Sequence, residues 1–335
     1  MRKAVAPGKL ILSGEHAVVY NQPALAMAVN RYATAWVSPQ QGAHIAFDLL
    51  NLRYHKKMTL SALKKLKTRL HESYQSFLEG DRPIRDVLKL PYELSTYAFS
   101  HLLDKLNHQL SDGVKLSSHS DIPLGCGMGS SAAMILSVMH ALALQQGLSI
   151  SSEQYLEHAR ETEHLQHGRS SGVDLHVSLR GGALHYHQGQ ISERPLPTIP
   201  LWIINTGKPK SSTGECVAAV ASKINTPQCL HDFAQVTTAL DAALSSHNFP
   251  EIQRCIKENH ALLTDIGVVP EPIQELIELL MARGIAAKIC GAGAIGGDKA
   301  GIVLLVAEKL PSGLPDNIVR LIEHIEGDHR GLHSL

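Results

Sequence analysis

The chain has 335 residues, of which 44% are hydrophobic and 19% charged, and its formal net charge is +0. This composition excludes a disordered chain and fits a globular protein long enough to hold two hydrophobic cores. The balanced charge provides no long-range attraction to nucleic acid or to an anionic membrane, and we expect neither as a partner. No apolar segment has the length of a membrane span, and Gly8 interrupts the N-terminal apolar stretch, so no signal peptide is expected.

The spacing of cysteines and histidines argues against disulfide and zinc sites. The five cysteines are scattered and form no CxxC pair, which is typical of a reduced, cytoplasmic protein whose thiols serve as small apolar residues. Histidine is unusually frequent, but neither EHLQHG (163–168) nor HYH (185–187) has the spacing of an HExxH zinc motif. These patterns favour surface or hydrogen-bonded histidines over a zinc site.

The first part of the chain mixes strands and helices. Two short apolar runs, KLIL (9–12) and AVVY (17–20), flank the polar turn SGEH and are expected to be buried strands. The run from Ala132 to Leu144 is apolar on nearly all sides, and Ser130 and Gly147 suit the start and the stop of a buried helix. The other elements expected here are strands at 33–38, 45–49, 113–119 and near 176–187, and helices at 59–79, 92–110 and 153–167, the last ending at Gly168.

A proline-rich stretch divides the chain. SERPLPTIP (192–200) breaks all periodicity, and we take it as the boundary between one domain, residues 1–191, and a second, residues 201–335. The second domain is expected to contain strands at 201–205, 286–290 and 301–306, and helices near 229–246, 251–265, 271–283 and 315–325. Strands and helices mixed in two halves predict an α+β protein of two domains.

A glycine-rich loop precedes the buried helix. The stretch DIPLGCGMGSS (121–131) alternates Gly125, Gly127 and Gly129 with other residues and ends in two serines. Such a loop places backbone N–H groups and the positive end of a helix dipole around an anion, usually phosphate, and a serine hydroxyl there can ligate Mg²⁺. An ordinary helix cap after a flexible turn is the alternative, and the three glycines favour the phosphate loop. No Walker A motif, GxxxxGK[ST], occurs in the sequence.

A second glycine-rich stretch, GAGAIG (291–296), matches the dinucleotide pattern GxGxxG. That pattern should follow a strand and open a helix, but here another strand is expected to follow it. A nicotinamide-binding site is therefore disfavoured. We expect instead a glycine-rich hairpin, which either lines the phosphate site or is purely structural.

Two carboxylates stand at unusual positions. Glu163 ends an apolar helical stripe with Leu156 and Ala159, where a carboxylate should be paired, metal-bound or extended to water. Near a phosphate loop, metal ligation is favoured. Asp174 lies between a Ser-Gly turn and an expected strand, as a turn cap or as a general base, and spacing alone does not decide between these roles. Lys9 is open to surface and functional readings in the same way.

These segments resemble the GHMP kinases, in three motifs that follow the family's order. They are PGKLILSGEHAVVY (7–20), PLGCGMGSSAA (123–133) and KICGAGAIGG (288–297). Within this superfamily, GEHAVVY and the stretch EHLQHGRSSGVDLHVSLRGGALHYHQGQ (163–190) resemble the mevalonate kinase family most. The resemblance implies a ribosomal-S5-like N-terminal domain, a ferredoxin-like C-terminal domain, an active site in the cleft between them, and a homodimer.

The resemblance also implies an activity, the ATP-dependent phosphorylation of mevalonate to 5-phosphomevalonate in isoprenoid biosynthesis. Asp174 would be the catalytic base, with Lys9 beside it and beside the substrate hydroxyl. Glu15 and His16 would lie near the substrate or phosphates, and Ser131 and Glu163 would hold Mg²⁺. The nucleotide's phosphates would lie on the loop and helix start, formed by Gly125, Gly127, Met128, Gly129, Ser130, Ser131 and Ala132.

Several residues depart from the family pattern. Asn21 replaces a frequent glycine, Cys126 and Met128 replace a small residue and a leucine, and Leu175 follows the aspartate. The third motif is longer and less rich in glycine than the familiar GAGGGG. The alternatives are another GHMP kinase, acting on phosphomevalonate or homoserine, and a nucleotide-binding relative without catalytic activity.

Overall fold

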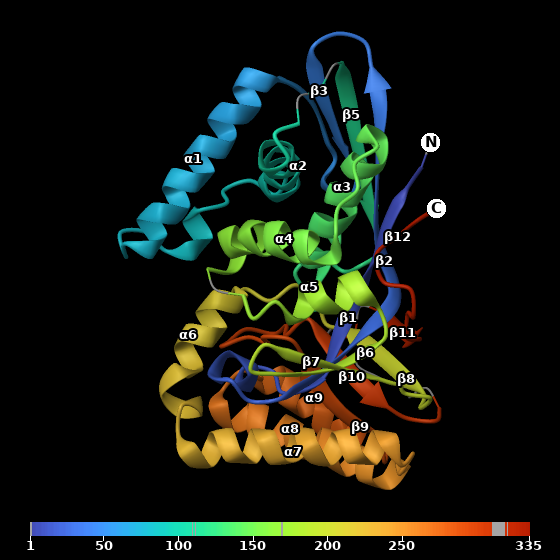
Figure 1. The fold of residues 1–335 in the computed structure, drawn as a ribbon. Coiled ribbons are helices and arrows are strands. Elements are labelled where there is room, and N and C mark those ends of the chain that lie inside the picture. Colours follow the sequence, from blue (N-terminus) through green and yellow to red (C-terminus); the bar gives the residue numbers. More distant parts are fainter. Residues whose placement is uncertain (1, 109, 111, 169, 310–318, 320) are drawn as a thin grey trace.

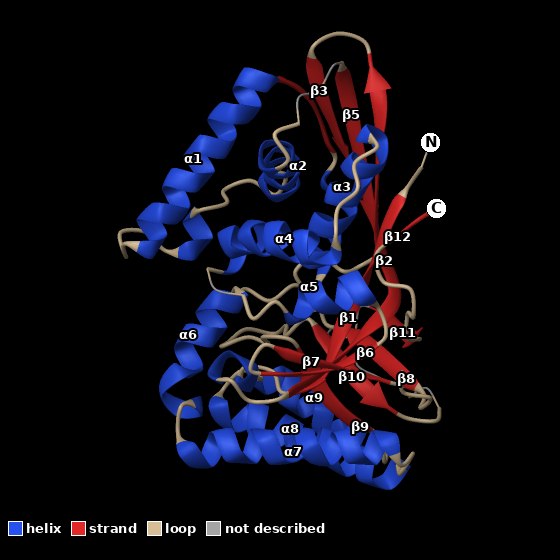
Figure 2. Ribbon diagram, in the orientation of Figure 1, coloured by secondary structure: helices blue, strands red, loops and turns tan. Residues whose placement is uncertain are grey.

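The computed structural model describes residues 2–335 except 109, 111, 169, 310–318 and 320. Its strands form two separate sheets, one of eight strands and one of four (Figure 1, Figure 2). Helices cover both sheets, so the protein is α+β, as predicted.

The larger sheet has the order β12-β1-β2-β5-β3-β4, with β6 on β2 and β7 on β6. Its pairs are antiparallel except β3 with β5. Every residue of β1 is buried, and the register of β1 against β2 shifts between Pro7 and Gly8. The strands are β1 Ala4–Ser13, β2 Ala24–Gln40, β3 His44–Leu49, β4 Tyr54–Thr59, β5 Gly113–Ser120, β6 Ala183–His187, β7 Gln190–Arg194 and β12 His333–Ser334.

Five helices belong to this part: α1 Leu60–Leu78, α2 Glu93–Lys105, α3 Ser130–Gln146, α4 Ser152–His167 and α5 Val173–Arg180. Helix α3 is apolar nearly all round, as the sequence predicts, because it packs against β1 and β2 on one side and against α2, α4 and α5 on the others. Helix α1 lies outermost in Figure 1.

The smaller sheet is antiparallel in the order β11-β8-β10-β9. Its strands are β8 Leu201–Asn205, β9 Ala286–Cys290, β10 Ile302–Val306 and β11 Leu321–Ile325. The helices of this half are α6 Thr213–Ile224, α7 Pro227–Ser245, α8 Phe249–Ile266 and α9 Glu271–Ala282, and α7 and α8 lie at the bottom of Figure 1. Helix α8 packs on β9 and α7 packs on α8.

Three expectations about secondary structure are wrong in whole or in part. Residues Ala17–Tyr20 form a 3₁₀ helix, η1, because Gly14 and Asn21 have positive φ and turn the chain at both ends. The strand expected near 176–187 is present only at β6, Ala183–His187, because residues 173–180 form helix α5. The apolar residues of 173–179 alternate, but the side chains between them at 176 and 178 are buried as well, so the alternation does not distinguish a strand from a buried helix.

The third wrong expectation is the terminal helix near 315–325. Residues 321–325 form the edge strand β11, and 310–318 and 320 lie outside the described residues. Helix α6 was not predicted, although its start carries a capping box in which Ser212 and Glu215 cap each other's backbone N–H groups. Two further 3₁₀ turns, η2 Leu50–Leu52 and η3 Ile84–Asp86, lie in connections.

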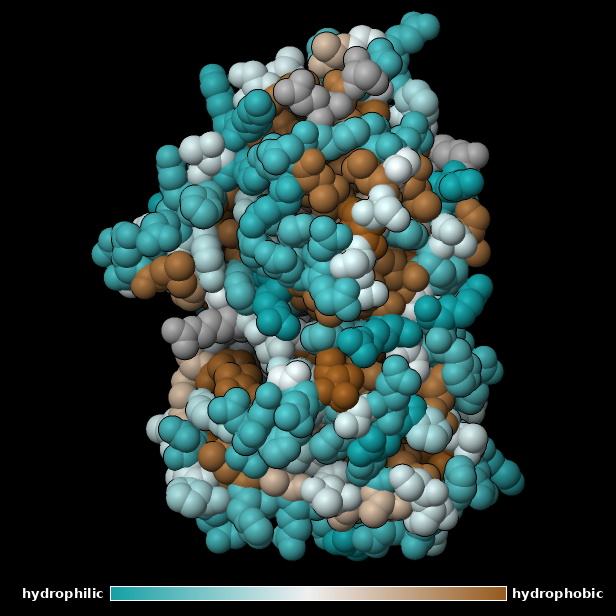
Figure 3. Space-filling view, viewed as in Figure 1, coloured by the Kyte–Doolittle hydropathy of each residue, from teal (hydrophilic) through white to brown (hydrophobic). Residues whose placement is uncertain are grey.

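The face of the protein seen in Figure 3 is mainly polar. Figure 3 shows hydrophilic residues over most of the visible face, with hydrophobic patches between them. Among the described residues, no helix is both long enough and apolar enough to cross a bilayer.

Candidate active site

The structure brings Lys9 and Asp174 together, although 165 positions separate them. Lys9 Nζ lies 3.2 Å from Asp174 Oδ1, and the Lys9 side chain is 4% exposed while that of Asp174 is 30% exposed. Asp174 stands in the first turn of α5, directly after Gly172, whose φ of 80° starts the helix. Burial alone would lower the pKa of Lys9, but the Asp174 carboxylate, helped by Cys290 and Glu15, raises it above its ordinary value. Lys9 is therefore a permanent cation at the floor of the site.

The glycine-rich loop lies directly on this pair. A Cβ on Gly129 would stand 2.8 Å from Lys9 Cγ and 3.6 Å from Asp174 Oδ2. The backbone of Lys9 donates a hydrogen bond of 2.9 Å to the Met128 carbonyl, which fixes the loop to β1. Loop, lysine and aspartate thus form one contiguous surface.

The other two glycines of the loop are also crowded by protein atoms. A Cβ on Gly127 would stand 2.3 Å from the Cys290 carbonyl at the end of β9, and one on Gly125 would stand 3.0 Å from Lys208 Cε. Both residues have positive φ. From the sequence, we expected glycines here so that a phosphate could approach the backbone. The structure adds a second reason, because Cys290 and Lys208 leave no room for side chains at these positions.

The loop ends at the N-terminus of α3, where Gly129 is the N-cap and no side chain caps the first amides. These N–H groups and the helix dipole are therefore available to an anion. Ser131 Oγ lies 3.4 Å from His167 Nε2, at the end of α4. Burial lowers the pKa of His167, and Asp174 and Lys9 both act on it electrostatically. His167 thus joins Ser131 to the same cluster.

Glu163 is one helical turn before His167 and points inward, 1% exposed. Ser170 Oγ donates a short hydrogen bond to its carboxylate and accepts one of 3.0 Å from the Gly172 amide, which ties Glu163 to the start of α5. Burial raises the pKa of Glu163 to about 7, and the negative charge of Asp174 raises it further. The hydrogen bond from Ser170 and the charges of Lys9 and Arg160 lower this pKa, but by less. The carboxylate therefore lacks sufficient positive charge around it.

The donor set suits a hard divalent cation. Glu163 supplies carboxylate oxygens and Ser131 a hydroxyl, which are the ligand types that Mg²⁺ prefers. No salt bridge to Glu163 occurs within the described residues, and its raised pKa is that of a buried acid short of a cation. Glu163, Ser131 and a nearby phosphate are thus chemically compatible with a bound Mg²⁺.

Glu15 and His16 join the first motif to the third. Glu15 forms an ion pair with Lys288 of β9, and both side chains are almost completely buried. His16 has a φ of 60°, and its Nε2 lies 3.1 Å from the Ala292 carbonyl. Burial lowers the pKa of His16 to about 4, so the ring is neutral and its Nε2–H donates this bond. Contact of these two residues with substrate stays a prediction.

The GAGAIG stretch lies between the antiparallel strands β9 and β10 and opens no helix. A Cβ on Gly291 would stand 2.9 Å from Gly127 Cα, and a Cβ on Gly301 would stand 2.5 Å from the Cys126 carbonyl. The segment therefore packs against the glycine-rich loop, as one of the two readings of its sequence predicts, and the topology of a dinucleotide-binding motif is absent from it.

Sequence reasoning missed four residues around this site: Ser170, His167, Lys208 and Lys288. The motif stretches contain the first two and Lys288, but nothing in their spacing shows which partner each side chain meets. Lys208 follows β8, and its side chain reaches Gly125 only because the two sheets meet there.

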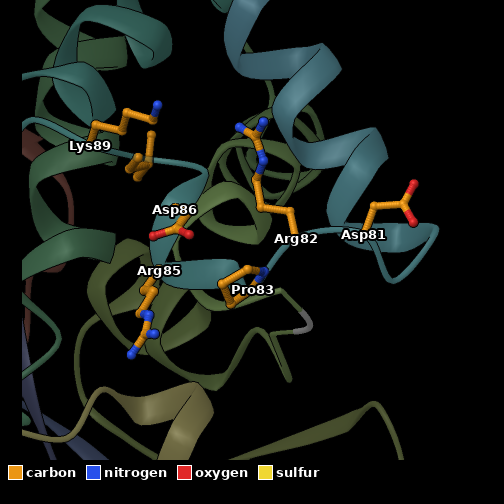
Figure 4. A pocket seen from close by; sticks show the side chains of 7 residues that line it. Asp81, Arg82, Pro83, Arg85, Asp86 and Lys89 are labelled. Atoms are coloured by element: carbon orange, nitrogen blue, oxygen red, sulfur yellow. The ribbon is translucent and has the colours of Figure 1, made fainter.

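A separate hollow of about 520 Å³ lies beside η3, between α1 and α2 (Figure 4). Its charged residues are Asp81, Arg82, Arg85, Asp86 and Lys89. Arg82 donates to Ser73 Oγ and Arg85 pairs with Glu215 at 3.2 Å. Because both signs of charge line it, this hollow has no evident preference for an anion or a cation, and it contains none of the predicted site residues.

Comparison with known proteins agrees with this geometry. The GHMP kinase N-terminal domain family matches residues 93–182. The mevalonate kinase of Thermococcus onnurineus is 31% identical over 304 residues, which cover 88% of this chain and 86% of that protein. The mevalonate kinase of Mus musculus is 30% identical over 342 residues, covering 90% and 85%. The Methanococcus jannaschii mevalonate kinase structure superposes with a TM-score of 0.77 at 21% identity, covering 97% and 98%, and shows a common fold.

The fold and the loop are those of the GHMP kinases. Within them, this chain belongs to the mevalonate kinase family.

Proposed function

We propose that this protein transfers the γ-phosphoryl group of ATP to the 5-hydroxyl of mevalonate. The contact of Lys9 with Asp174, directly under Gly129, carries the proposal, because it joins a base and a fixed cation to a loop suited to phosphate. The names of the relatives supply the acceptor.

In this mechanism Asp174 accepts the proton of the attacking hydroxyl, and its partly exposed carboxylate leaves room for that approach. Lys9 stabilises the alkoxide character that develops on the oxygen. The amides of the loop and of the first turn of α3, residues 125–132, hold the phosphates. Ser131 and Glu163 would hold Mg²⁺, which when bound neutralises charge on the phosphate oxygens.

Glu15 and His16 are buried and are tied to β9 and to the loop that follows it. We propose that these two residues form the wall of the site on the side of the acceptor substrate. We further propose that residues 1–191 and 201–335 are the two domains, with β12 of the second returning to the sheet of the first. We also propose that the protein acts in the cytoplasm and that it is a homodimer.

An acceptor panel tests the activity. ADP release is measured with mevalonate, phosphomevalonate, homoserine and galactose at equal concentrations. The proposal requires the highest kcat/KM with mevalonate. Preference for another acceptor would move the protein elsewhere among the GHMP kinases, and ATP binding without any product would make it a non-catalytic relative.

A further inference from the structure

A cluster of two histidines and a glutamate lies between helices α2 and α4. His101 comes from α2, and His158 and Glu161 come from α4, three positions apart and therefore on one face of that helix. One potential ligand atom from each of the three lies within 4.8 Å of the others. No other such group of three ligand-type side chains occurs in the part of the chain that the structure describes.

Both histidines are buried with ring nitrogens that lack hydrogen-bond partners. His101 is 2% exposed and His158 is 6% exposed. Among the described residues, Nδ1 of His101 and Nδ1 of His158 have no hydrogen-bond partner, and the polar neighbour of His101 Nε2 is the Glu161 carboxylate, at 3.4 Å. An unsatisfied buried polar atom costs about 1–3 kcal/mol, so two of them on adjacent rings point to a missing ligand.

The rings of His101 and His158 lie close together, edge to face. His101 stacks on Tyr97 with ring centroids 5.3 Å apart, and its ring meets that of His158 edge-on at 5.9 Å. A neutral imidazole offers a ring-nitrogen lone pair to a metal, and the two rings bring such nitrogens close together.

Glu161 closes the cluster at the surface. Its Oε2 lies 3.4 Å from His101 Nε2, and its Oε1 pairs with Lys105 at 2.8 Å. The other charges that face the cluster are Lys67 of α1 and its partner Asp104, 2.7 Å apart. Two carboxylates and two ammonium groups balance, so no excess positive charge repels a cation.

We propose that His101, His158 and Glu161 bind one divalent transition-metal ion of the Zn²⁺ type, which joins α2 to α4. This site is separate from the oxygen-rich group around Ser131 and Glu163, and the proposal does not depend on the proposed function.

The ligand types decide the kind of ion. Two imidazoles and one carboxylate suit Zn²⁺, Co²⁺ or Ni²⁺, whereas Mg²⁺ prefers oxygen ligands alone. Ligand atoms around a tetrahedral zinc lie about 3.3 Å apart, given bonds of about 2.0–2.1 Å. The cluster therefore has to contract slightly, and the surface position of Glu161 allows its carboxylate to turn inward. Water would complete the coordination.

The experiment is a titration of the full, metal-free protein with Zn²⁺ against a chromophoric chelator, in millimolar Mg²⁺. One tight equivalent is expected in the wild type. His101→Gln and Glu161→Gln should each weaken that equivalent at least about tenfold. With Co²⁺ in place of Zn²⁺, the wild type should show the visible absorption of a low-coordinate site, and both variants should lose it.

Matched controls separate this site from the chain's other ligands. Glu157→Gln makes the same change one turn earlier on α4, and His71→Ala removes an exposed histidine of α1; both should bind Zn²⁺ as the wild type does. Ser131→Ala should do so too, because it touches only the oxygen-rich site.

Saturating Zn²⁺ should also raise the melting temperature of the wild type and not that of Glu161→Gln. Circular dichroism checks that each variant is folded, and the wild-type titration itself needs no variant. Absence of a tight equivalent in the wild type, or an unchanged affinity in folded Glu161→Gln, overturns the proposal.

Discussion

Two lysine–carboxylate pairs lie near each other in this protein and differ in one respect. Lys9 with Asp174 leaves the aspartate side chain 30% exposed, whereas Lys288 with Glu15 is sealed, at 0% and 1%. The open pair can receive a substrate and exchange a proton with it. The sealed pair holds β9 against the end of β1. The same chemistry therefore serves reaction in one place and cohesion in the other, and burial makes the difference.

The largest effect is expected at the open pair. Asp174→Asn removes the base and keeps the shape, so kcat with mevalonate should fall about 10²–10⁴-fold. ATP affinity, measured by fluorescence titration, should stay within about twofold of the wild type, because the loop amides are untouched. Full turnover in this variant would remove Asp174 from the mechanism.

The sealed pair should affect folding more than catalysis. Glu15→Gln leaves Lys288 as a buried charge without its partner, and the free energy of unfolding should fall by about 3–5 kcal/mol. Adding Lys288→Met should recover most of this loss, because the double variant leaves no unpaired charge there. Denaturant unfolding of the three proteins measures the coupling, and strictly additive losses would contradict a direct pair.

Acid should weaken the region around the sealed pair. Burial, with a smaller contribution from Lys288, lowers the pKa of His260 to about 4 from an ordinary 6.5. Between these values the unfolded chain binds the proton and the folded one does not, so stability rises with pH from about 4 to 6.5 and falls in the other direction. For this one residue the change is at most about 3 kcal/mol.

The test is the pH dependence of unfolding in wild type and His260→Gln. The variant should have a shallower slope between pH 4 and 6.5 and the same slope above it. Equal slopes throughout would show that His260 has its ordinary pKa in the folded protein.

The smallest effect is expected from replacing a glycine, and a comparison of two glycines separates the cost of backbone strain from the cost of a clash with Lys9. Gly129 and Gly147 have nearly equal φ values of 68° and 64°, but a Cβ at Gly147 meets nothing within 4 Å. Gly147→Ala should cost about 1 kcal/mol through backbone strain alone. Gly129→Ala adds a clash with Lys9 and should cost more, and it should also raise KM for ATP. Equal losses of stability in both would mean that the loop yields easily.

The sequence predicted those helices and strands that depend on local residue patterns. The all-round apolar helix α3, the ends of α4 and the strands of the smaller sheet that precede residue 310 followed from periodicity and capping. Long-range partners did not follow, because nothing near Glu15 indicates Lys288, and nothing near His158 indicates His101. The predicted site residues Lys9, Gly129 and Asp174 are neighbours in the structure. Their placement in one site came from the resemblance to family motifs, and their spacing in the sequence did not predict it. Alternating apolar residues misled at α5, where burial on several sides removes the contrast between faces.

The pairing of β12 with β1 has a consequence for biogenesis. Ala4 and Val5 align with Ser334 and His333, and the backbones of Lys3 and Leu335 bond to each other at 2.8 and 3.1 Å. The start of β1, at Ala4 and Val5, gains its second neighbour only once residues 333–334 have been synthesised, so that on the ribosome this end of the strand stays uncovered through most of translation. Variants that slow synthesis of the second half should therefore aggregate through β1, even where the finished protein is stable.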